Sequence, residues 1–409
     1  MERYPRVLGI IQAGGQGARM DVLTRERAKP SLAYAGAYRL IDFPLSSFAN
    51  SGISDVWVSV SYLASTLDPY MAQGRPWDLD RTRGGYRRVV PEEGWAESES
   101  GFAAGNADNL VQLATAIEEF DGDVLVVMSA DHVFNLDLRP VIWEHLGREA
   151  ECTVLTAEVP QTEARHKGVV RVGRDGLVTG FEYKPEKASG TTVAAEILVY
   201  EPKVLLHELR RLRGELASKE GDGSSGLGDF GDHLLPALVA RGKTYATELP
   251  GYWKDLGRPQ TYLQAHRDLL SGKVDVFDQP GFPILTRWPE RAPAMVRPGG
   301  QVDDALLSGG VLVMGTVCRS VLGPGVTIER GAVVENSVLG AGVTVRRGAQ
   351  VHTSIIDDGC EIGRDAVVGG PAPSNLPRDK DIAMLGRDCR IGAGTQVEAG
   401  ARLEPGSTV

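Results

Sequence analysis

The chain has 409 residues, of which 42% are apolar and 24% are charged, and its formal net charge is −10. This length suits two domains, the composition is that of a soluble globular protein, and the acidic balance excludes a general nucleic-acid surface, which needs a basic face. No stretch is long enough for a membrane span, no secretory signal opens the chain, and the four cysteines lack metal-ligand or disulfide spacing, so we expect a cytoplasmic protein.

The chain opens with a short apolar run, Val7 to Ile11, that is typical of a buried parallel strand. A glycine turn and two cations follow; these residues are Gly14, Gly15, Gly17, Arg19 and Lys29. Glycine lets backbone N–H groups approach phosphate oxygens, and arginine and lysine neutralise charge on a departing pyrophosphate. The stretch therefore predicts a site for a nucleoside triphosphate.

Further along, residues 56–61 alternate as a second strand, and the polar residues 68–101 are predicted to form a surface excursion. Asn106 is predicted to be the N-cap of a helix with apolar residues at helical spacing. Residues 123–128 indicate a buried strand, and Asp131 follows its carboxyl end, the edge where ligands of open α/β sheets gather.

The remaining elements of this part alternate between strands and helices. Strands are predicted at 152–159, 169–172, 177–183, 193–200 and 244–249, and helices after Pro202, near 232–240 and at 258–270. This order predicts a Rossmann-like, mixed, mostly parallel sheet covered by helices. We assign residues 1–271 to this domain, and residues 272–300, which carry several prolines without a steady period, to a linker.

Residues 301–409 follow a different pattern, a repeat of six residues. Aliphatic residues keep this step, and small residues stand two places before them; the last aliphatic positions are Ile391, Val397, Leu403 and Val409. One aliphatic and one small inward position in every six are typical of a parallel β-helix, which we expect to be left-handed. Residues 369–379, with three prolines, are predicted to loop out between coils.

Four motifs of the first domain occur in order, and together they are specific. They are Ala13–Arg19 (AGGQGAR), Arg27–Pro30 (RAKP), Tyr38–Ser46 (YRLIDFPLS) and Asn50–Ile53 (NSGI). They resemble the signature of the sugar-phosphate nucleotidyltransferases, and within them the bacterial ADP-glucose pyrophosphorylase (glucose-1-phosphate adenylyltransferase) family. The resemblance implies transfer of an adenylyl group from ATP to glucose 1-phosphate, giving ADP-glucose and pyrophosphate for glycogen or another α-glucan.

The resemblance also implies roles for individual residues. Arg19 and Lys29 match the family's pyrophosphate-handling cations, beside a nucleotide-binding turn of Gly14, Gly15 and Gly17. Asp131 and Asp255 match two aspartates that hold Mg²⁺, an ion that takes oxygen ligands and usually only one or two carboxylates. We regard His132 as a structural neighbour. The implied contacts to the sugar phosphate are Lys184, Gly105, Asn106, Gly168 and Glu182.

Several positions depart from the family pattern. The carboxylate expected before Lys184 is Tyr183 here, with Glu182 one residue earlier, and a slip of one residue along a strand turns a side chain to the other face. Glu196 stands where a glycine is usual, and Glu26 replaces a lysine linked to sugar-phosphate effectors, so we do not expect the usual allosteric activation. Other departures near base and sugar are Ser61, Ala104, and Glu92 and Glu93 after Pro91, where the usual segment reads Pro-Ala-Gln. These changes predict altered specificity or reduced activity.

Two alternatives therefore stay open: a nucleotidyltransferase for another sugar 1-phosphate or base, and a weakly active paralogue that serves as a regulatory subunit. Intact phosphate-handling residues count against the second. An acyltransferase, which left-handed β-helices often host, would need a catalytic histidine, and His352 has no acyl-carrier signal beside it. We expect a homotetramer, with a hetero-oligomer with a paralogue left open, and neither a nucleic-acid nor a membrane partner.

Overall fold

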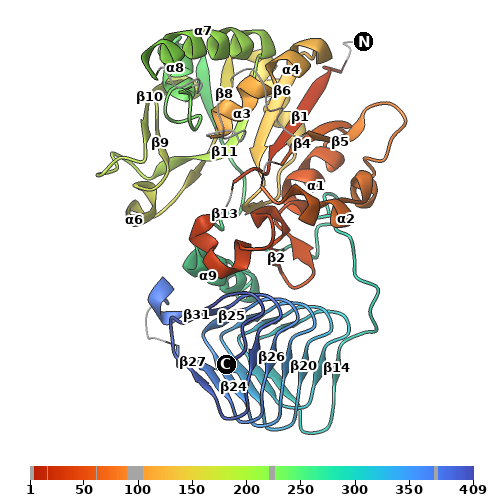
Figure 1. Cartoon of the computed structure of the whole chain (residues 1–409). Coiled ribbons are helices and arrows are strands. Elements are labelled where there is room, and N and C mark those ends of the chain that lie inside the picture. Colours follow the sequence, from red (N-terminus) through yellow and green to blue (C-terminus); the bar gives the residue numbers. More distant parts are fainter. Residues whose placement is uncertain (1–3, 16, 61, 90–104, 221–225, 373–375) are drawn as a thin grey trace.

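The computed structural model describes residues 4–15, 17–60, 62–89, 105–220, 226–372 and 376–409, with the backbone alone for 217–220. The predictions made for Ser61, Pro91, Glu92, Glu93 and Ala104 lie outside these residues. Figure 1 shows a sheet-and-helix domain at the amino-terminal side of the chain, and a β-helix that follows it and packs below it.

The first domain is built on a mixed nine-stranded sheet with the order β10-β9-β11-β6-β1-β4-β5, extended by β8 next to β11 and β12 next to β8. Its parallel centre is formed by β6 (Val124–Ser129), β1 (Val7–Gln12), β4 (Asp55–Ser59) and β5 (Gly85–Val89). The other strands are β8 (Cys152–Glu158), β9 (Gly168–Val172), β10 (Val178–Tyr183), β11 (Thr192–Tyr200) and β12 (Thr244–Glu248). The antiparallel pairing of β11 with β6 and β8 makes the sheet mixed, as predicted.

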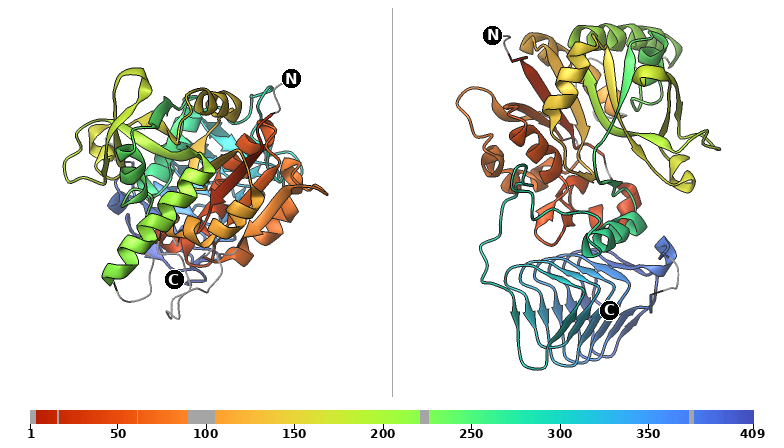
Figure 2. Two further views of the ribbon diagram at one scale, coloured as in Figure 1. Left: turned by 90° about the horizontal axis from the view of Figure 1, so that it is seen from above. Right: turned by 180° about the vertical axis from the view of Figure 1, so that it is seen from behind.

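Helices cover both faces of this sheet, which explains the continuous apolar run of β1. On one face, Leu8 and Ile10 join a core with α3 (Asn106–Gln112), α4 (Ala114–Phe120), α7 (Pro202–Glu220) and α8 (Leu234–Ala240). On the other face, Val7 and Ile11 join a core with α1 (Asp42–Asn50) and α5 (Leu138–Gly147). Figure 2 shows these two layers from above and from behind.

Two local predictions were wrong. Asn106 is the first helical residue rather than the N-cap, because its side-chain oxygen accepts a hydrogen bond from the Phe230 amide, and Gly105 takes the cap position. Residues 68–101 were predicted to be a surface excursion, but their described part contains α2 (Asp68–Met71), a 3-10 turn at Ala72–Trp77 and the edge strand β5. Trp77 is fully buried there, and Tyr70, Met71 and Leu79 are buried with it, so this segment contributes one side to the core.

Short elements connect the sheet to the second domain. A two-stranded antiparallel ribbon pairs β7 (His132–Phe134) with β13 (Trp253–Asp255), and a second ribbon pairs β2 (Ala33–Tyr34) with β3 (Tyr38–Arg39). The helix α6 (Gln161–Ala164) precedes β9, and α9 (Pro259–Leu270) follows β13 and lies above the β-helix in Figure 1. Short 3-10 turns complete the described elements, at Ala18–Thr24, Lys29–Ser31, Ala64–Thr66, Arg174–Gly176 and Asp379–Asp381.

The second domain is a left-handed β-helix of three parallel six-stranded sheets. The first sheet contains β14 (Met295–Val296), β17 (Leu312–Val313), β20 (Thr327–Ile328), β23 (Thr344–Val345), β26 (Glu361–Ile362) and β29 (Arg390–Ile391). The second contains β15 (Gln301–Asp303), β18 (Thr316–Cys318), β21 (Val333–Glu335), β24 (Gln350–His352), β27 (Val367–Gly369) and β30 (Gln396–Val397). The third contains β16 (Leu306–Leu307), β19 (Val321–Leu322), β22 (Val338–Leu339), β25 (Ser354–Ile356), β28 (Ala383–Leu385) and β31 (Arg402–Leu403).

The six-residue repeat fills the interior of these coils, as the sequence predicted. Ile328, Val334, Val345 and Val351 are fully buried in one core, whereas Val409 is 48% exposed, so the inward pattern does not extend to this residue. The predicted excursion at 369–379 lies between β27 and β28, although residues 373–375 are outside the described part. The first strand of the helix starts at Met295, inside the interval predicted as a linker.

Charged contacts hold the two domains together. The Arg27 guanidinium is 8% exposed and pairs with Asp357 and, at 3.2 Å, with Asp358 of the β-helix. The Arg267 side chain of α9 donates to the Asn336 side-chain oxygen at 2.7 Å. Because Arg27 is two residues from Lys29, the loop that carries this lysine is fixed from the β-helix side. Within the described part of the chain, no helix has the length and apolarity needed to cross a membrane.

Candidate active site

A cavity of about 500 Å³ lies at the carboxyl ends of β1 and β6. This volume is in the range of small-molecule sites. Most predicted site residues line it, although they come from distant parts of the sequence: Gly14, Gly15, Arg19, Lys29, Gly105, Asn106, Asp131, Lys184 and Asp255. The structure thus brings together the glycine turn, three predicted cations and both predicted acids.

The glycine turn is held at the end of β1 and orders the lysine behind it. The Ala13 amide donates to the Ser59 carbonyl at 2.8 Å, which ties the turn to β4. Gly17 has a φ of 64° and does not line the cavity; a Cβ there would lie 3.1 Å from the Lys29 Cβ. Only glycine adopts this backbone without strain and leaves room for the lysine stem. Gly17 therefore shapes the site through Lys29 packing.

Lys29 is a buried cation paired with Asp131. Its side chain is 7% exposed, and its ammonium donates to Asp131 Oδ2. Burial alone would lower the pKa of Lys29, but the Asp131 and Asp255 carboxylates outweigh it and raise that pKa above its usual value. Arg19 is exposed at the cavity wall. This part of the site therefore carries one buried charge fixed by an ion pair and one exposed charge.

The ribbon of β7 and β13 brings the two acids together. Asp255 is the register partner of His132, and the Leu256 amide donates to the Asp131 carbonyl at 3.2 Å. Lys167 donates to Asp255 Oδ2 at 2.8 Å. Burial opposes ionisation of both aspartates, but the nearby lysines and His132 outweigh it and lower the pKa of each carboxyl. Both acids are therefore ionised at neutral pH.

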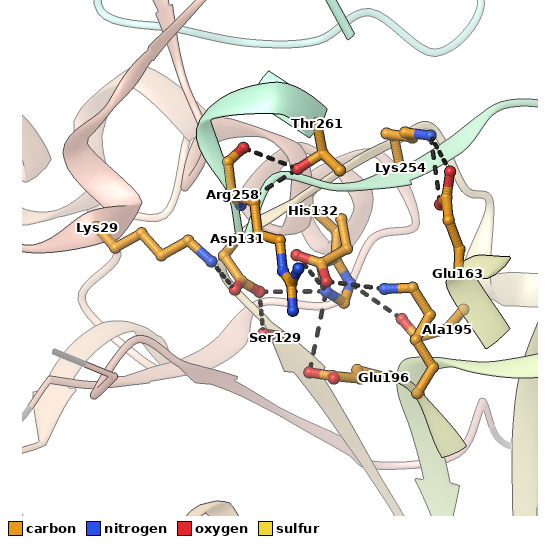
Figure 3. Close-up of polar contacts among 12 residues, drawn as sticks. Lys29, Ser129, Asp131, His132, Glu163, Ala195, Glu196, Lys254, Arg258 and Thr261 are labelled. Atoms are coloured by element: carbon orange, nitrogen blue, oxygen red, sulfur yellow. Dashed lines mark hydrogen bonds and ion pairs between the residues drawn. The ribbon is translucent and has the colours of Figure 1, made fainter. Parts of the chain in front are cut away.

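His132 lies among three carboxylates. Figure 3 shows Asp131 and Glu196 approaching its ring, and the Nε2 atom is 3.2 Å from Asp131 Oδ1 and 3.9 Å from Glu196 Oε2. Asp255 Oδ1 is also 3.9 Å from this nitrogen. Asp131, His132 and Glu196 each offer one potential ligand atom, and these three atoms lie within 4.8 Å of one another. This acidic and imidazole cluster has the donor set of a divalent-metal site.

Lys184 and Tyr183 also line the cavity and share an acidic partner. Lys184 is 51% exposed and lies 3.3 Å from Asp229 Oδ2, and the Tyr183 hydroxyl donates to the same oxygen at 2.5 Å. The Lys184 ammonium also lies 4.3 Å from the centre of the Tyr183 ring. The lysine is therefore held at the cavity edge with its charge open to solvent.

Glu182 and Gly168, both predicted to contact the sugar phosphate, do not line the cavity. Successive residues of β10 face opposite sides of the sheet, so Tyr183 faces the cavity and Glu182 lies 4.0 Å from Arg171 instead. A Cβ on Gly168 would lie 2.6 Å from the Phe181 ring, so this glycine is required by packing between β9 and β10. The structure differs from the sequence interpretation at these two positions.

Sequence reasoning missed several lining residues. Lys167 was visible only as the neighbour of a glycine, and its contact with Asp255 joins segments far apart in the chain. Asp229 follows a Gly- and Ser-rich stretch and carried no signal. His132 was interpreted as structural, and Glu196 was noticed only as a departure, although both belong to the acidic cluster.

The fold and this cavity define a class of protein. The family model described as nucleotidyl transferase matches residues 8–272, and the one described as GlmU-like C-terminal hexapeptide matches residues 294–378. The chain therefore belongs to the nucleotidyl transferase family.

Within that family, three similar relatives share one name. A glucose-1-phosphate adenylyltransferase of Thermotoga maritima is 36% identical over 332 residues, which cover 80% of this chain and 76% of the relative. One of Clostridium acetobutylicum is 33% identical over 331 residues, covering 80% and 84%. One of Thermomicrobium roseum is 36% identical over 306 residues, covering 74% and 69%. These relatives group the chain with the glucose-1-phosphate adenylyltransferases.

Proposed function

We propose that this chain transfers an adenylyl group from ATP to glucose 1-phosphate, giving ADP-glucose and pyrophosphate. A phosphate oxygen of the sugar phosphate attacks the α-phosphorus of ATP, and the bond from that phosphorus to the bridging oxygen of the β-phosphate breaks. The observation that carries the proposal is the single cavity lined by the glycine turn with Arg19 and Lys29, by Lys184, and by Asp131 and Asp255. The names of the relatives supply the choice of ATP and glucose 1-phosphate.

In this proposal, the glycine turn and its cations bind the triphosphate. The exposed Arg19 follows the departing pyrophosphate, and the buried Lys29 supplies a charge whose position is already fixed by Asp131. A fixed charge in a partly buried site stabilises developing negative charge more than a mobile charge in water, because it needs no reorganisation during the reaction.

Lys184 binds the phosphate of the sugar substrate. Its pairing with Asp229 at 3.3 Å and its approach to the Tyr183 ring at 4.3 Å hold the ammonium at the cavity edge. Gly105 and Asn106 lie on the same cavity wall, where the backbone offers polar groups to the sugar or base. Orienting the attacking oxygen in this way lowers the entropic part of the barrier.

Asp131 and Asp255 would hold a divalent ion, which we propose to be Mg²⁺. The fit rests on Asp255 Oδ1, a buried atom without a hydrogen-bond partner among the described residues, and on two ionised carboxylates on one ribbon. When bound, such an ion neutralises phosphate charge and orients the α-phosphate. The protein's part is to keep both carboxylates ionised through Lys29 and Lys167.

A pyrophosphate-release screen tests the proposal. The purified chain is incubated with Mg²⁺, each common nucleoside triphosphate and a panel of sugar 1-phosphates, and pyrophosphate is measured by a coupled assay. We expect the highest kcat/KM with ATP and glucose 1-phosphate. Absence of turnover across the whole panel would refute the proposal and favour a regulatory subunit.

A second candidate is transfer to another hexose 1-phosphate. The observation in its favour is that Tyr183, a phenol, faces the cavity where the resemblance implies a carboxylate. A phenol donates to a single acceptor and cannot accept two sugar hydroxyls as a carboxylate does. The same panel separates the two candidates, because a higher kcat/KM with a different sugar would favour the second.

We further propose that the chain works in the cytoplasm as a homotetramer. Four free cysteines support a reducing compartment. Light scattering coupled to size-exclusion chromatography measures the mass, and a strict monomer would contradict the tetramer.

A further inference from the structure

Glu196 enters the cavity from an unusual backbone. Its φ is 56°, and the pairing of β11 with β8 shifts register between Ala194 and Leu198. A bulge of this kind re-aims one side chain out of the regular alternation. The Glu196 side chain thereby lines the cavity with 39% of its surface exposed, next to the ring of His132.

The ring of His132 is oriented as in metal-binding histidines. Its side chain is 2% exposed, and Nδ1 lies 3.1 Å from the Ala195 carbonyl oxygen, to which it donates. With Nδ1 held by this carbonyl, Nε2 is the ring nitrogen that faces the carboxylates. A ligating histidine typically donates its other ring N–H to a carbonyl or carboxylate in the same way.

The acids around Nε2 divide their oxygens between lysines and this nitrogen. Asp131 Oδ2 accepts from Lys29, and its Oδ1 accepts from the Ser129 hydroxyl and lies 3.2 Å from His132 Nε2. Asp255 gives Oδ2 to Lys167, and its buried Oδ1, 3.9 Å from Nε2, has no hydrogen-bond partner in the described part of the chain. Two ligand atoms about 2.1 Å from one ion lie roughly 3 to 4 Å apart, and the distances of the Asp131, Glu196 and Asp255 oxygens from Nε2 fall in this range.

Two of the three acids around the cluster pair with lysines. Lys29 and Lys167 compensate Asp131 and Asp255, whereas Glu196 forms an ion-pair contact with His132 but with no lysine or arginine among the described residues. A divalent cation at Nε2 would compensate the Glu196 carboxylate and would also satisfy the orphan oxygen of Asp255.

We infer that Glu196 and His132 extend the aspartate pair into a four-residue site that binds a divalent ion of the Mn²⁺ type without nucleotide. This inference rests on the proposed function, since it adds two ligands to the metal pair named there. Three carboxylates suit Mn²⁺ as well as Mg²⁺, but an imidazole ligand favours the transition ion. The site is thus loaded before substrates arrive, rather than by an ion carried in on the triphosphate.

The test follows Mn²⁺ binding to the metal-free full chain in the absence of nucleotide and sugar. The electron paramagnetic resonance signal of free Mn²⁺ disappears on binding, so a titration gives stoichiometry and Kd. We expect one ion per chain, Mg²⁺ at least about tenfold weaker in competition, and nitrogen modulation of the electron spin echo from His132. Absence of binding, or equal affinity for Mg²⁺, would overturn the inference, and absence of nitrogen modulation would remove His132 from the site.

The informative variant is Glu196→Gly, because glycine adopts the positive φ of this position without strain. This variant should fold with an undiminished melting temperature. It should bind Mn²⁺ at least about tenfold more weakly, because removing a direct ligand lowers metal affinity at least as much as removing a residue that only orients a ligand. Glu196→Gln tests the charge with the stem kept. Glu398→Gln, an exposed acid of the β-helix, is the matched control and should bind as the wild type does. Unchanged Mn²⁺ affinity in Glu196→Gly would refute the inference.

The outcome separates the inference from the proposed function. If the wild type releases pyrophosphate with Mg²⁺ and Glu196→Gly binds Mn²⁺ as tightly as the wild type, the inference fails and the proposed function stands. If Mn²⁺ binding depends on Glu196 and no substrate pair gives turnover, the site stands and the proposed function fails.

Discussion

Replacing Lys184 by glutamine should weaken use of the sugar phosphate without weakening the fold. The lysine is 51% exposed, and its pair with Asp229 is at the surface, so its removal should change the free energy of unfolding by at most about 1 kcal/mol. Position 184 has a backbone φ of 44°, which strains lysine and glutamine equally. The substitution therefore leaves the backbone contribution to stability unchanged. The structural effect is therefore small.

The effect on substrate use should be much larger. A hydrogen bond from an ammonium to a phosphate contributes about 1.5 to 3 kcal/mol, and each 1.4 kcal/mol is a factor of ten. KM for the sugar 1-phosphate should therefore rise roughly 10- to 100-fold, while KM for ATP changes less than about threefold. Initial rates of pyrophosphate release, with each substrate varied in turn, measure both constants.

The control is Lys187→Gln, an exposed lysine of the same segment that does not line the cavity. It should leave both KM values as in the wild type. The reasoning is refuted if Lys184→Gln raises KM for ATP as much as KM for the sugar phosphate, or if Lys187→Gln has the same effect.

Three further changes test other contacts. Asp131→Asn should abolish Mg²⁺-dependent turnover. It should also lower the free energy of unfolding by roughly 2 to 4 kcal/mol, because the Lys29 side chain is 7% exposed and loses its counter-charge. An unchanged midpoint in urea unfolding would contradict this expectation. Asp357→Asn should destabilise the chain by roughly 2 to 4 kcal/mol, because the buried Arg27 then keeps Asp358, at 3.2 Å, as its remaining carboxylate partner among the described residues. A loss below about 1 kcal/mol in thermal unfolding would show that the contact with Asp357 is unimportant. Burial lowers the pKa of His145 and of His266 from 6.5 to about 4. As the pH drops below 6.5, these histidines take up protons in the unfolded chain but not in the folded chain, so the free energy of unfolding falls. Between pH 7 and pH 5 each histidine should cost about 2 kcal/mol, and a double His→Gln variant should show a shallower loss in urea titrations at the two pH values.

Periodicity and motifs determined much of this protein from the sequence. The six-residue repeat predicted the β-helix, because each coil buries its own aliphatic residue in a core that runs the length of the domain. The apolar run of Val7–Gln12 and the glycines after it predicted a strand and a turn at the cavity, since both signals are local. Segment 68–89 was missed because its burial depends on Trp77 packing against distant residues rather than on its own polar composition.

Only the tertiary structure decided how the site is composed. The pairing of β7 with β13 brings Asp131 beside Asp255, and the bulge in β11 turns Glu196 towards His132. The face of β10 that meets the cavity selects Tyr183 over Glu182, which a shift of one residue would have reversed. Such contacts join residues far apart in the chain. A sequence pattern records which neighbours alternate along one strand, but the charge and ligand environment of a side chain depends on which strands lie beside it.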